Sequence, residues 1–593
     1  MTVFPSDNRP IKIEDDVPAT MGDGTKLRAD VYRPDDDGRY PVLVCRTPYD
    51  KRRPDYIDTA RTLAARGYIA VVQDLRGRYK SDGEFIWQFR PESETFDARD
   101  GHETIEWAAA LKGSDGRAGT WGHSYPSWCV WRLAATRPPS LKALFASGMS
   151  ARIRDLNFGI FETGRRLEWT YQMAVDSRLR RGDRSGPTEW RAAAEQWRKS
   201  ERERWLWQLP LDSIPDHVFG PLAPQLKAYF RNQDKEFWAF DMAHQQVNVP
   251  TCQVTGWWDR LIGTIDNFTG MVANGPAGLR DQHRLVIGPW GHGNMTWTRR
   301  QGPLDLGPAA DARYVDFVTR WYDYQFKEYD NGVESEPPIR LFVINANTWR
   351  YETGWPLPGT RFTEFHLHSR GNARTPDGDG TLSRAEPAGE PPDTFDYDPR
   401  RPVPSLMAED AQAAPRDQSI LDDRADILVY QTDPIEAELE VIGPVTLKLW
   451  AASSAPETDF TAKLVDVRPD GLAYNLCYGI VRSSYRDSYD DPRPIEPGKP
   501  YEYTIRMMPT GVLFRQGHRI RLDISSSDFP NFDRNHNTGR NFWSDSELRT
   551  AHQTVFHDQS RPSRLILPVV REGGGETARG QRSDARDLLG DRF

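Results

Sequence analysis

The chain has 593 residues, too many for a single hydrophobic core, so we expect two or three domains. Lysine and arginine total 77 against 86 aspartate and glutamate residues, and the net charge of −9 argues against a nucleic-acid partner. No apolar run approaches the roughly 18 residues of a membrane-spanning helix, so no membrane partner is expected.

The N-terminus and the cysteines indicate the compartment. The opening residues, MTVFPSDNRPIKIEDD, lack the basic region and apolar core of a signal peptide. The four cysteines lie far apart without C-x-x-C spacing, and three of them sit in apolar segments that favour buried free thiols. We therefore expect a cytoplasmic protein.

The first 150 residues alternate strands with helices. Apolar runs at Tyr40–Cys45, Tyr68–Gln73 and Leu141–Ala146 are typical of strands buried on both faces. Helices are predicted at Tyr56–Ala65, which ends at a glycine, and at Asp97–Leu111. This alternation predicts a parallel sheet with right-handed crossover connections.

Between two of these elements lies the run GTWGHSYPSW, residues 119–128, which places Ser124 between a short strand and a helix. A serine at such a junction projects from a tight turn, and the amides of the new helix point toward negative charge beside it. The usual pattern is G-x-S-x-G, whereas this chain has Pro126 at the fifth position, where the first helical turn tolerates proline. An ordinary turn serine is the alternative interpretation of this short pattern.

The alternation stops after residue 150. Residues 150–246 are rich in Arg, Glu and Trp at helical spacing, as in Trp190–Trp207, which predicts a helical insertion. Two further strand–helix units then complete the predicted sheet: Thr251–Trp257 with Ile265–Val272, and His283–Gly288 with Ala312–Phe326.

Beyond residue 346 short alternating strands and frequent proline and glycine predict an all-β sandwich or jelly roll. The predicted strands are Thr363–His368, Ala437–Trp450, Phe460–Val467, Tyr501–Met508, Arg519–Ser525 and Arg564–Val570. We expect residues 371–417 to be a long loop and the polar tail 571–593 to be disordered. The predicted domains are 1–149 with 247–345, the insertion 150–246, and the β domain 346–570.

A serine nucleophile needs a base, usually histidine, which a carboxylate orients. Asp259 comes just after the strand Thr251–Trp257, and His292 follows the strand that begins at His283. Catalytic groups gather at the carboxyl ends of parallel strands, so we expect both side chains at one edge of the sheet. A surface turn for Asp259 and an ordinary loop position for His292 are the alternatives, and Asp266 is a rival that lies inside the next predicted helix.

Other histidines have weaker claims. His123 adjoins Ser124, but its side chain is expected to point elsewhere, and His102 falls in a predicted helix. His366 and His368 share a face of a predicted strand and offer a metal pair, although a plain strand pair is the better interpretation. We therefore predict no metal and no cofactor.

The loop after the first buried strand reads Arg46-Thr47-Pro48-Tyr49-Asp50-Lys51. Such a loop commonly supplies one donor to the hole that holds a negatively charged oxygen during acyl transfer. The Tyr49 phenol is one candidate donor, the backbone amide of Tyr125 is the second, and Tyr49 as a packing residue is the alternative.

Together these segments resemble the cocaine esterase family, which is grouped with the X-Pro dipeptidyl peptidases and the α-amino acid ester hydrolases. The pieces that carry the resemblance follow one another in the family's order: RTPYDK (46–51), DLRGRYKSDGEF (74–85), GTWGHSY (119–125), GWWD (256–259), IGPWGH (287–292), FVINANTWR (342–350) and SSSDFPNFDRNHNTG (525–539).

The resemblance implies an α/β-hydrolase domain with an inserted helical cap and a C-terminal β jelly-roll domain. It implies Ser124 as nucleophile, Asp259 as orienting carboxylate and His292 as base, with Tyr49 and the Tyr125 amide around the oxyanion. The implied activity is that of a serine hydrolase that cleaves a small-molecule carboxylic ester or amide through an acyl-enzyme. His123 and the run from Pro126 depart from the family's pattern. This departure affects the expected shape of the pocket and not the triad.

Substrate choice depends on residues outside the triad. The amino-ester hydrolases lead us to expect acidic residues just after the triad aspartate, whereas this chain has Arg260 and Leu261 there. We therefore favour an uncharged or anionic acyl group, with Arg260, Leu261 and Trp169 as candidate substrate contacts. An X-Pro dipeptidyl peptidase or α-amino acid ester hydrolase, and a non-catalytic binding protein on the same scaffold, are the alternatives. The oligomeric state is left open, a homo-oligomer included.

Overall fold

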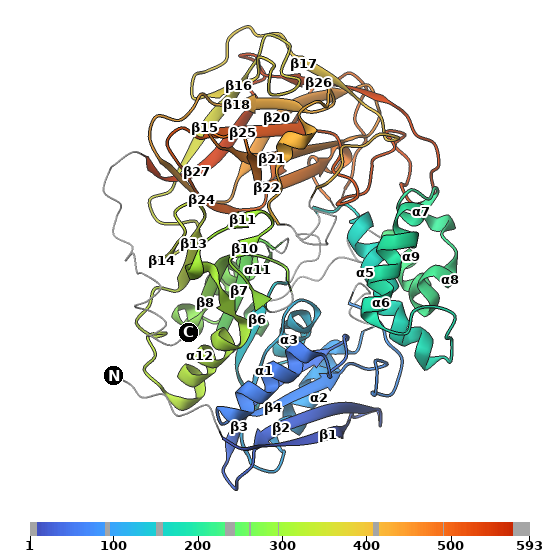
Figure 1. The fold of residues 1–593 in the computed structure, drawn as a ribbon, viewed down its shortest axis with the longest axis vertical. Coiled ribbons are helices and arrows are strands. Elements are labelled where there is room, and N and C mark those ends of the chain that lie inside the picture. Colours follow the sequence, from blue (N-terminus) through green and yellow to red (C-terminus); the bar gives the residue numbers. More distant parts are fainter. Residues whose placement is uncertain are drawn as a thin grey trace.

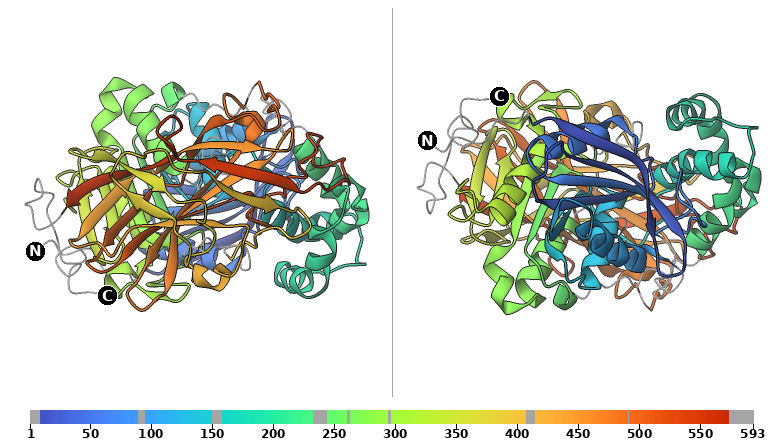
Figure 2. Two further views of the ribbon diagram at one scale, coloured as in Figure 1. Left: turned by 90° about the horizontal axis from the view of Figure 1, so that it is seen from above. Right: turned by 90° about the horizontal axis from the view of Figure 1, so that it is seen from below.

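The computed structural model describes residues 9–88, 95–149, 158–231, 244–259, 263–293, 296–406, 414–489 and 491–572. Figure 1 shows a mixed α/β part at the bottom, a β part at the top and a group of helices at one side. The two views of Figure 2 place this helical group at the same side of both other parts. In the described residues, no helix is both long and apolar enough to cross a bilayer.

The α/β part is built on one ten-stranded sheet that is parallel from β4 to β13 and has antiparallel strands at both edges. Its strands in spatial order are β1 (Ile11–Thr20), β2 (Lys26–Pro34), β4 (Ile69–Asp74), β3 (Tyr40–Thr47), β5 (Ser114–Thr120), β6 (Leu141–Ser147), β7 (Thr251–Trp258), β8 (Arg284–Gly291), β13 (Ile339–Val343) and β14 (Thr348–Glu352). The central strands are buried on both faces, which explains why their sequences are continuous apolar runs.

Helices cover both faces of this sheet. They are α1 (Pro54–Ala65), α2 (Asp97–Ala109), α3 (Tyr125–Ala135), α11 (Gly263–Asn274) and α12 (Tyr314–Lys327). Helix α2 packs beside α3, and α1 packs beside α12. All four cysteines are buried free thiols, as expected for three of them.

The helical group contains no strand within its described residues 158–231. It consists of α5 (Thr163–Arg180), α6 (Trp190–Gln196), a π-helical turn (Trp197–Glu201), α7 (Arg202–Leu206), α8 (Asp216–Phe219) and α9 (Ala223–Arg231). The fully buried Arg78 holds α5 against the sheet, since its guanidinium donates to the carbonyls of Pro48 and Met173 and to the Ser177 hydroxyl. Helix α5 therefore has a fixed position above the carboxyl ends of the strands.

The β part is a thirteen-stranded sheet system. Its strands are β15 (Arg361–His368), β16 (Thr381–Ser383), β17 (Asp393–Tyr397), β18 (Leu428–Gln431), β19 (Leu439–Gly443), β20 (Thr446–Ser453), β21 (Asp459–Val467), β22 (Ala473–Arg482), β23 (Tyr501–Arg506), β24 (Thr510–Phe514), β25 (Arg519–Ser525), β26 (Ala551–Phe556) and β27 (Arg564–Glu572). Strand β20 pairs with β23 over residues 446–451, and it also pairs with β27 over residues 446–448 and with β26 over residues 450–453. The strands of this part enclose an apolar core.

Two expectations about this part need correction. The stretch 371–417 is not one long loop, because it contains β16 and β17. The predicted strand Ala437–Trp450 is two strands, β19 and β20, which break at Gly443-Pro444 because proline cannot donate to a ladder. The tail beyond residue 572 lies outside the described residues, so its predicted disorder stays a prediction.

The two β-containing parts meet through main-chain pairing. Ile344, just after β13, donates its amide to the Gly511 carbonyl at 2.8 Å and accepts from the Leu513 amide at 2.9 Å in β24. The β part is therefore joined to the edge of the sheet next to β8.

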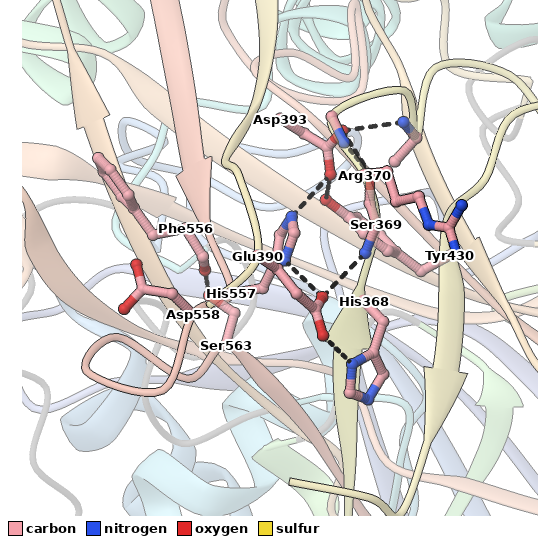
Figure 3. Close-up of polar contacts among 12 residues, drawn as sticks. His368, Ser369, Arg370, Glu390, Asp393, Tyr430, Phe556, His557, Asp558 and Ser563 are labelled. Carbon is pink, nitrogen blue, oxygen red and sulfur yellow. Dashed lines mark hydrogen bonds and ion pairs between the residues drawn. The ribbon is translucent and has the colours of Figure 1, made fainter. Parts of the chain in front are cut away.

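A buried polar network fixes one end of the β part (Figure 3). His557 is fully buried between two carboxylates, with Nε2 2.9 Å from Asp393 Oδ2 and Nδ1 3.2 Å from Glu390 Oε2. Glu390 also binds His368 Nδ1 at 2.8 Å, and Tyr430 donates to Asp393 at 2.8 Å. These contacts tie strands β15, β17 and β18 to the turn after β26.

The two carboxylates of this network stabilise the fold more at neutral pH than at acidic pH. Burial alone raises the pKa of Asp393, but hydrogen bonds from His557, the Ala373 amide and Tyr430 outweigh it and lower this pKa below its ordinary value. Hydrogen bonds from His368 and the Ser369 amide likewise outweigh burial and lower the pKa of Glu390. A carboxyl with a lowered folded-state pKa stabilises the fold above its unfolded pKa, near 4, and this contribution is lost as the pH falls through the folded value.

Replacing His557 with glutamine should lower the free energy of unfolding at pH 7 by about 3–5 kcal/mol, because the buried Asp393 and the partly exposed Glu390 lose their shared partner. Urea denaturation measures this loss, which should shrink as the pH falls below about 4. His552→Gln is the matched control, since His552 pairs with Asp396 at an exposed site. Equal losses in both variants would contradict the assigned importance of the network.

Candidate active site

Ser124 occupies a strained turn between β5 and α3. Its φ of 64° and ψ of −126° are rare for residues with a side chain and are typical of a nucleophile elbow. A Cβ on Gly122 would lie 2.5 Å from the Pro126 carbonyl carbon, so the turn requires glycine there. Pro126 lies in the first turn of α3, as expected. The Ser124 amide donates to the Ser147 carbonyl at 3.0 Å, which ties the elbow to the end of β6.

Asp259 and His292 lie at the ends of the adjacent parallel strands β7 and β8. His292 Nε2 is 2.9 Å from Ser124 Oγ, and His292 Nδ1 is 3.0 Å from Asp259 Oδ1. The three side chains, which come from three parts of the chain, therefore form one continuous hydrogen-bonded array. Asp266 lies in α11 and binds Arg506, and His283 precedes β8 and binds Thr251, so neither belongs to this array.

The Asp259 carboxyl is suited to holding a positive charge on His292. Only 3% of its surface is exposed. Burial raises its pKa, but the charge and hydrogen bond of His292 outweigh burial and lower this pKa below its ordinary value. Asp259 is therefore ionised at neutral pH and stabilises a protonated imidazole.

Tyr49 lies in the loop after β3, where its backbone amide donates a hydrogen bond to Thr47 Oγ1 at 3.0 Å. Its hydroxyl accepts a hydrogen bond from the Trp169 indole of α5 at 3.2 Å. Burial raises the pKa of Tyr49, while Trp169 and the Ser124 hydroxyl act in the opposite sense, so the phenol keeps its proton at neutral pH. Because Trp169 occupies an acceptor position of the oxygen, the phenol proton is available to a negatively charged oxygen beside Ser124.

Tyr125 is the first residue of α3, so its amide belongs to the helix N-terminus, where negative charge is stabilised. Its ring is buried and stacks on Trp169 at 6.4 Å between centroids, and it meets Tyr49 edge-on at the same distance. The rings of Tyr49 and Tyr125 therefore pack together beside Trp169 of α5.

A cavity of about 700 Å³ opens above Ser124 and His292. The helical group lines much of it through Trp169, Val175, Leu179 and Trp190. Its volume is that of a pocket for a small organic ligand.

Of the five carboxylates among the described residues that line this cavity, three have arginine partners, and the other two are Asp50 and Glu189. Asp55 pairs with Arg53 at 2.7 Å. Glu168 and Asp176 lie 3.7 and 3.6 Å from the guanidinium groups of Arg198 and Arg78, in that order. These three carboxylates are therefore already compensated and offer little to a substrate ammonium group.

The other predicted site residues have different outcomes. Trp169 lines the cavity, whereas Arg260 and Leu261 lie outside the described residues. His368 binds Glu390, and the described residues contain no cluster of three metal-ligating side chains.

The expectation that His123 points away from the site was wrong. Its ring lies 4.8 Å from the His292 ring, because the strained backbone at Ser124 turns the preceding residue out of the alternation of a strand.

Comparisons with known proteins agree with this architecture. Residues 23–294 match the X-Pro dipeptidyl-peptidase (S15 family) model, and residues 331–566 match the X-Pro dipeptidyl-peptidase C-terminal non-catalytic domain. A cocaine esterase from Rhodococcus sp. (strain MB1 Bresler) is 33% identical over 94% of this chain and 99% of its own length. The predicted fold class, an α/β-hydrolase domain followed by a β-rich C-terminal domain, is confirmed.

Two solved structures share the fold. An α-amino acid ester hydrolase superposes with a TM-score of 0.78 at 22% identity and covers 96% of this chain and 98% of its own. An aminopeptidase from a marine sediment Thaumarchaeota archaeon gives the same TM-score, identity and coverage.

Proposed function

Because the chain belongs to the cocaine esterase family and is therefore a serine hydrolase of esters or amides, we propose that Ser124, Asp259 and His292 form its catalytic triad. The observation that carries this proposal is the hydrogen-bonded array from Ser124 through His292 to Asp259 at the floor of the cavity.

In the proposed reaction, Ser124 Oγ attacks the substrate carbonyl carbon while His292 Nε2 takes the serine proton. The carbonyl oxygen becomes negatively charged and accepts hydrogen bonds from the Tyr49 phenol and the Tyr125 amide. The protonated His292, held by Asp259, then gives its proton to the leaving alcohol or amine, and the C–O or C–N bond breaks. A water molecule repeats the sequence, with His292 as base, and releases the carboxylic acid.

The proposed substrate is a small-molecule ester or amide with an uncharged or anionic acyl group. A dipeptidyl peptidase or amino-ester hydrolase must bind a substrate ammonium group, normally with carboxylates. The arginine partners of Asp55, Glu168 and Asp176, three of the five described carboxylates that line the cavity, weaken such a site here. Arg260 and Leu261 stay candidate contacts.

We also propose the division into residues 1–149 with 247–345, 150–246 and 346–570, because the kind of element changes after β6, before β7 and after β14. The expected cytoplasmic location and the open question of a homo-oligomer stay predictions.

A hydrolysis panel tests the proposed substrate class. Aryl esters, simple amides and aminoacyl-prolyl anilides are incubated with the wild-type protein and with Ser124→Ala. We expect Ser124-dependent cleavage of aryl esters and little cleavage of the anilides. Efficient cleavage of aminoacyl-prolyl anilides that requires a free amine would overturn the preference for an esterase.

Replacing Trp169 with phenylalanine should lower kcat on an aryl ester by roughly 3–10-fold, the value of one neutral hydrogen bond. The phenyl ring keeps most of the packing in the cavity, but the Tyr49 hydroxyl loses the donor that orients it. Steady-state kinetics separate this effect from substrate binding, since KM should change less than kcat. Trp207→Phe, at a partly exposed tryptophan, is the control. A change confined to KM would make Trp169 a simple substrate contact.

A further inference from the structure

His123 contacts the candidate base and also lines the cavity above Ser124. Its ring centroid lies 4.8 Å from that of His292, and the two ring planes are inclined by 33°. Only 8% of its surface is exposed. The ring is thus packed at a tilt against the His292 ring and is separate from the Ser124–His292–Asp259 array.

The hydrogen bonds of His123 define its tautomer. Its Nε2 lies 3.1 Å from the His292 carbonyl oxygen, which can only accept, so Nε2 carries a proton. Its Nδ1 lies 2.9 Å from Ser147 Oγ, which can donate to it. A neutral imidazole with its proton on Nε2 satisfies both contacts. His292 is then held at its carbonyl by His123, at Nδ1 by Asp259 and at Nε2 by Ser124.

The surrounding groups keep this imidazole neutral. Burial lowers the pKa of His123 to about 4, and the charges of His292 and Arg53 act in the same direction. Asp259 and the hydrogen bond to the His292 carbonyl oppose this shift without cancelling it. A neutral ring stacked on His292 can accommodate the positive charge that His292 gains during the reaction, whereas a charged ring would repel it.

A glycine makes this close packing possible. Gly148 follows β6 with φ of +60°, and a Cβ there would lie 2.6 Å from His123 Cε1 and 2.9 Å from Asp259 Oδ2. Any side chain at this position would displace His123 and the triad carboxylate together. The space between His123 and Asp259 is therefore matched to a residue without a side chain.

We propose that His123 is a positioning residue that holds His292 in line with Ser124 by ring stacking and by a hydrogen bond to the His292 main chain. This inference rests on the proposed role of His292 as the catalytic base. His123 acts through His292 and does not itself exchange a proton with the substrate. A displacement of about 1 Å in a reacting group can reduce the rate about 100-fold, so the support of the base matters for kcat.

Two substitutions separate the two contacts. His123→Phe keeps a stacked ring but removes the donor to the His292 carbonyl, and kcat on an aryl ester should fall by about 10–100-fold with KM within about twofold. His123→Gln supplies an amide donor at the position of Nε2 and should recover most of the loss. The acid limb of the kcat/KM profile should persist in both variants, because neither substitution removes His292, the proposed general base. His552→Phe, at an exposed histidine of β26, is the control.

Phosphonate labelling distinguishes the possible failures. Ser124 should react fully with an aryl fluorophosphonate in the wild type and in His123→Phe, but more slowly in the variant. No labelling of Ser124 in the wild type would refute the proposed function. Labelling and kcat within twofold of the wild type in both His123 variants would refute the positioning role alone, and loss of the acid limb in His123→Phe would make His123 the titrating base.

Discussion

Replacing Ser124 with alanine should lower kcat on an aryl ester by about 10⁴–10⁶-fold, the usual effect of removing the nucleophile of a catalytic triad. His292 and Asp259 would remain paired, but no oxygen would lie at the 2.9 Å distance from His292 Nε2 that Ser124 Oγ now occupies. Substrate binding should be little changed, because the cavity walls come from other residues.

The measurement is steady-state hydrolysis, with purified protein whose thermal unfolding is checked. Ser200→Ala, at an exposed serine of the helical group, should keep the wild-type kcat. If Ser124→Ala retained more than about a hundredth of the wild-type kcat, the reaction would not require Ser124 as nucleophile.

Replacing Tyr49 with phenylalanine should lower kcat by about 10²–10³-fold, since loss of one oxyanion donor typically costs about 2.7–4 kcal/mol in the barrier. The variant should fold normally, because the ring and its edge-on contacts with Tyr125 and Trp190 are retained. KM should change little, since the donor acts on charge that develops only in the transition state.

Steady-state rates of Tyr49→Phe test this prediction. The control is Tyr324→Phe, since Tyr324 lies in α12 and does not line the cavity. An unchanged kcat in Tyr49→Phe would show that the phenol is not an oxyanion donor, and the Tyr125 amide would be the remaining candidate donor. A raised KM with an unchanged kcat would indicate a packing role in substrate binding.

Much of the candidate site could be predicted because one physical rule governs it. Parallel strands end at a common edge, so residues just after β5, β7 and β8 had to meet although Ser124 and His292 are 168 residues apart. The turn residues at Ser124 and the apolar runs of the buried strands gave clear signals.

His123 was misplaced because the alternation of side chains along a strand does not extend into the elbow. Residue 123 forms an isolated parallel bridge to Ser147, and the next residue has a positive φ. A glycine at position 148 beside this bridge is the one sequence feature that fits a close approach, but glycine alone does not identify its neighbours.

Other parts of the fold depend on pairing that the sequence does not display. Strand β1 is charged and mostly exposed, and it is a strand because β2 supplies its ladder. The short strand β17 lies among prolines and glycines and is held by β26 from the far end of the chain. The contact of Trp169 with Tyr49 joins the helical group to the α/β part across 120 residues, so no local pattern could predict it.

The most direct test of the proposed mechanism is to locate the covalent adduct of an aryl fluorophosphonate by peptide mass spectrometry. We expect one adduct per chain, on the peptide that contains Ser124, with no adduct in Ser124→Ala and much slower formation in His292→Gln. An unmodified Ser124 together with retained esterase activity, or an adduct on another serine, would contradict Ser124 as the nucleophile.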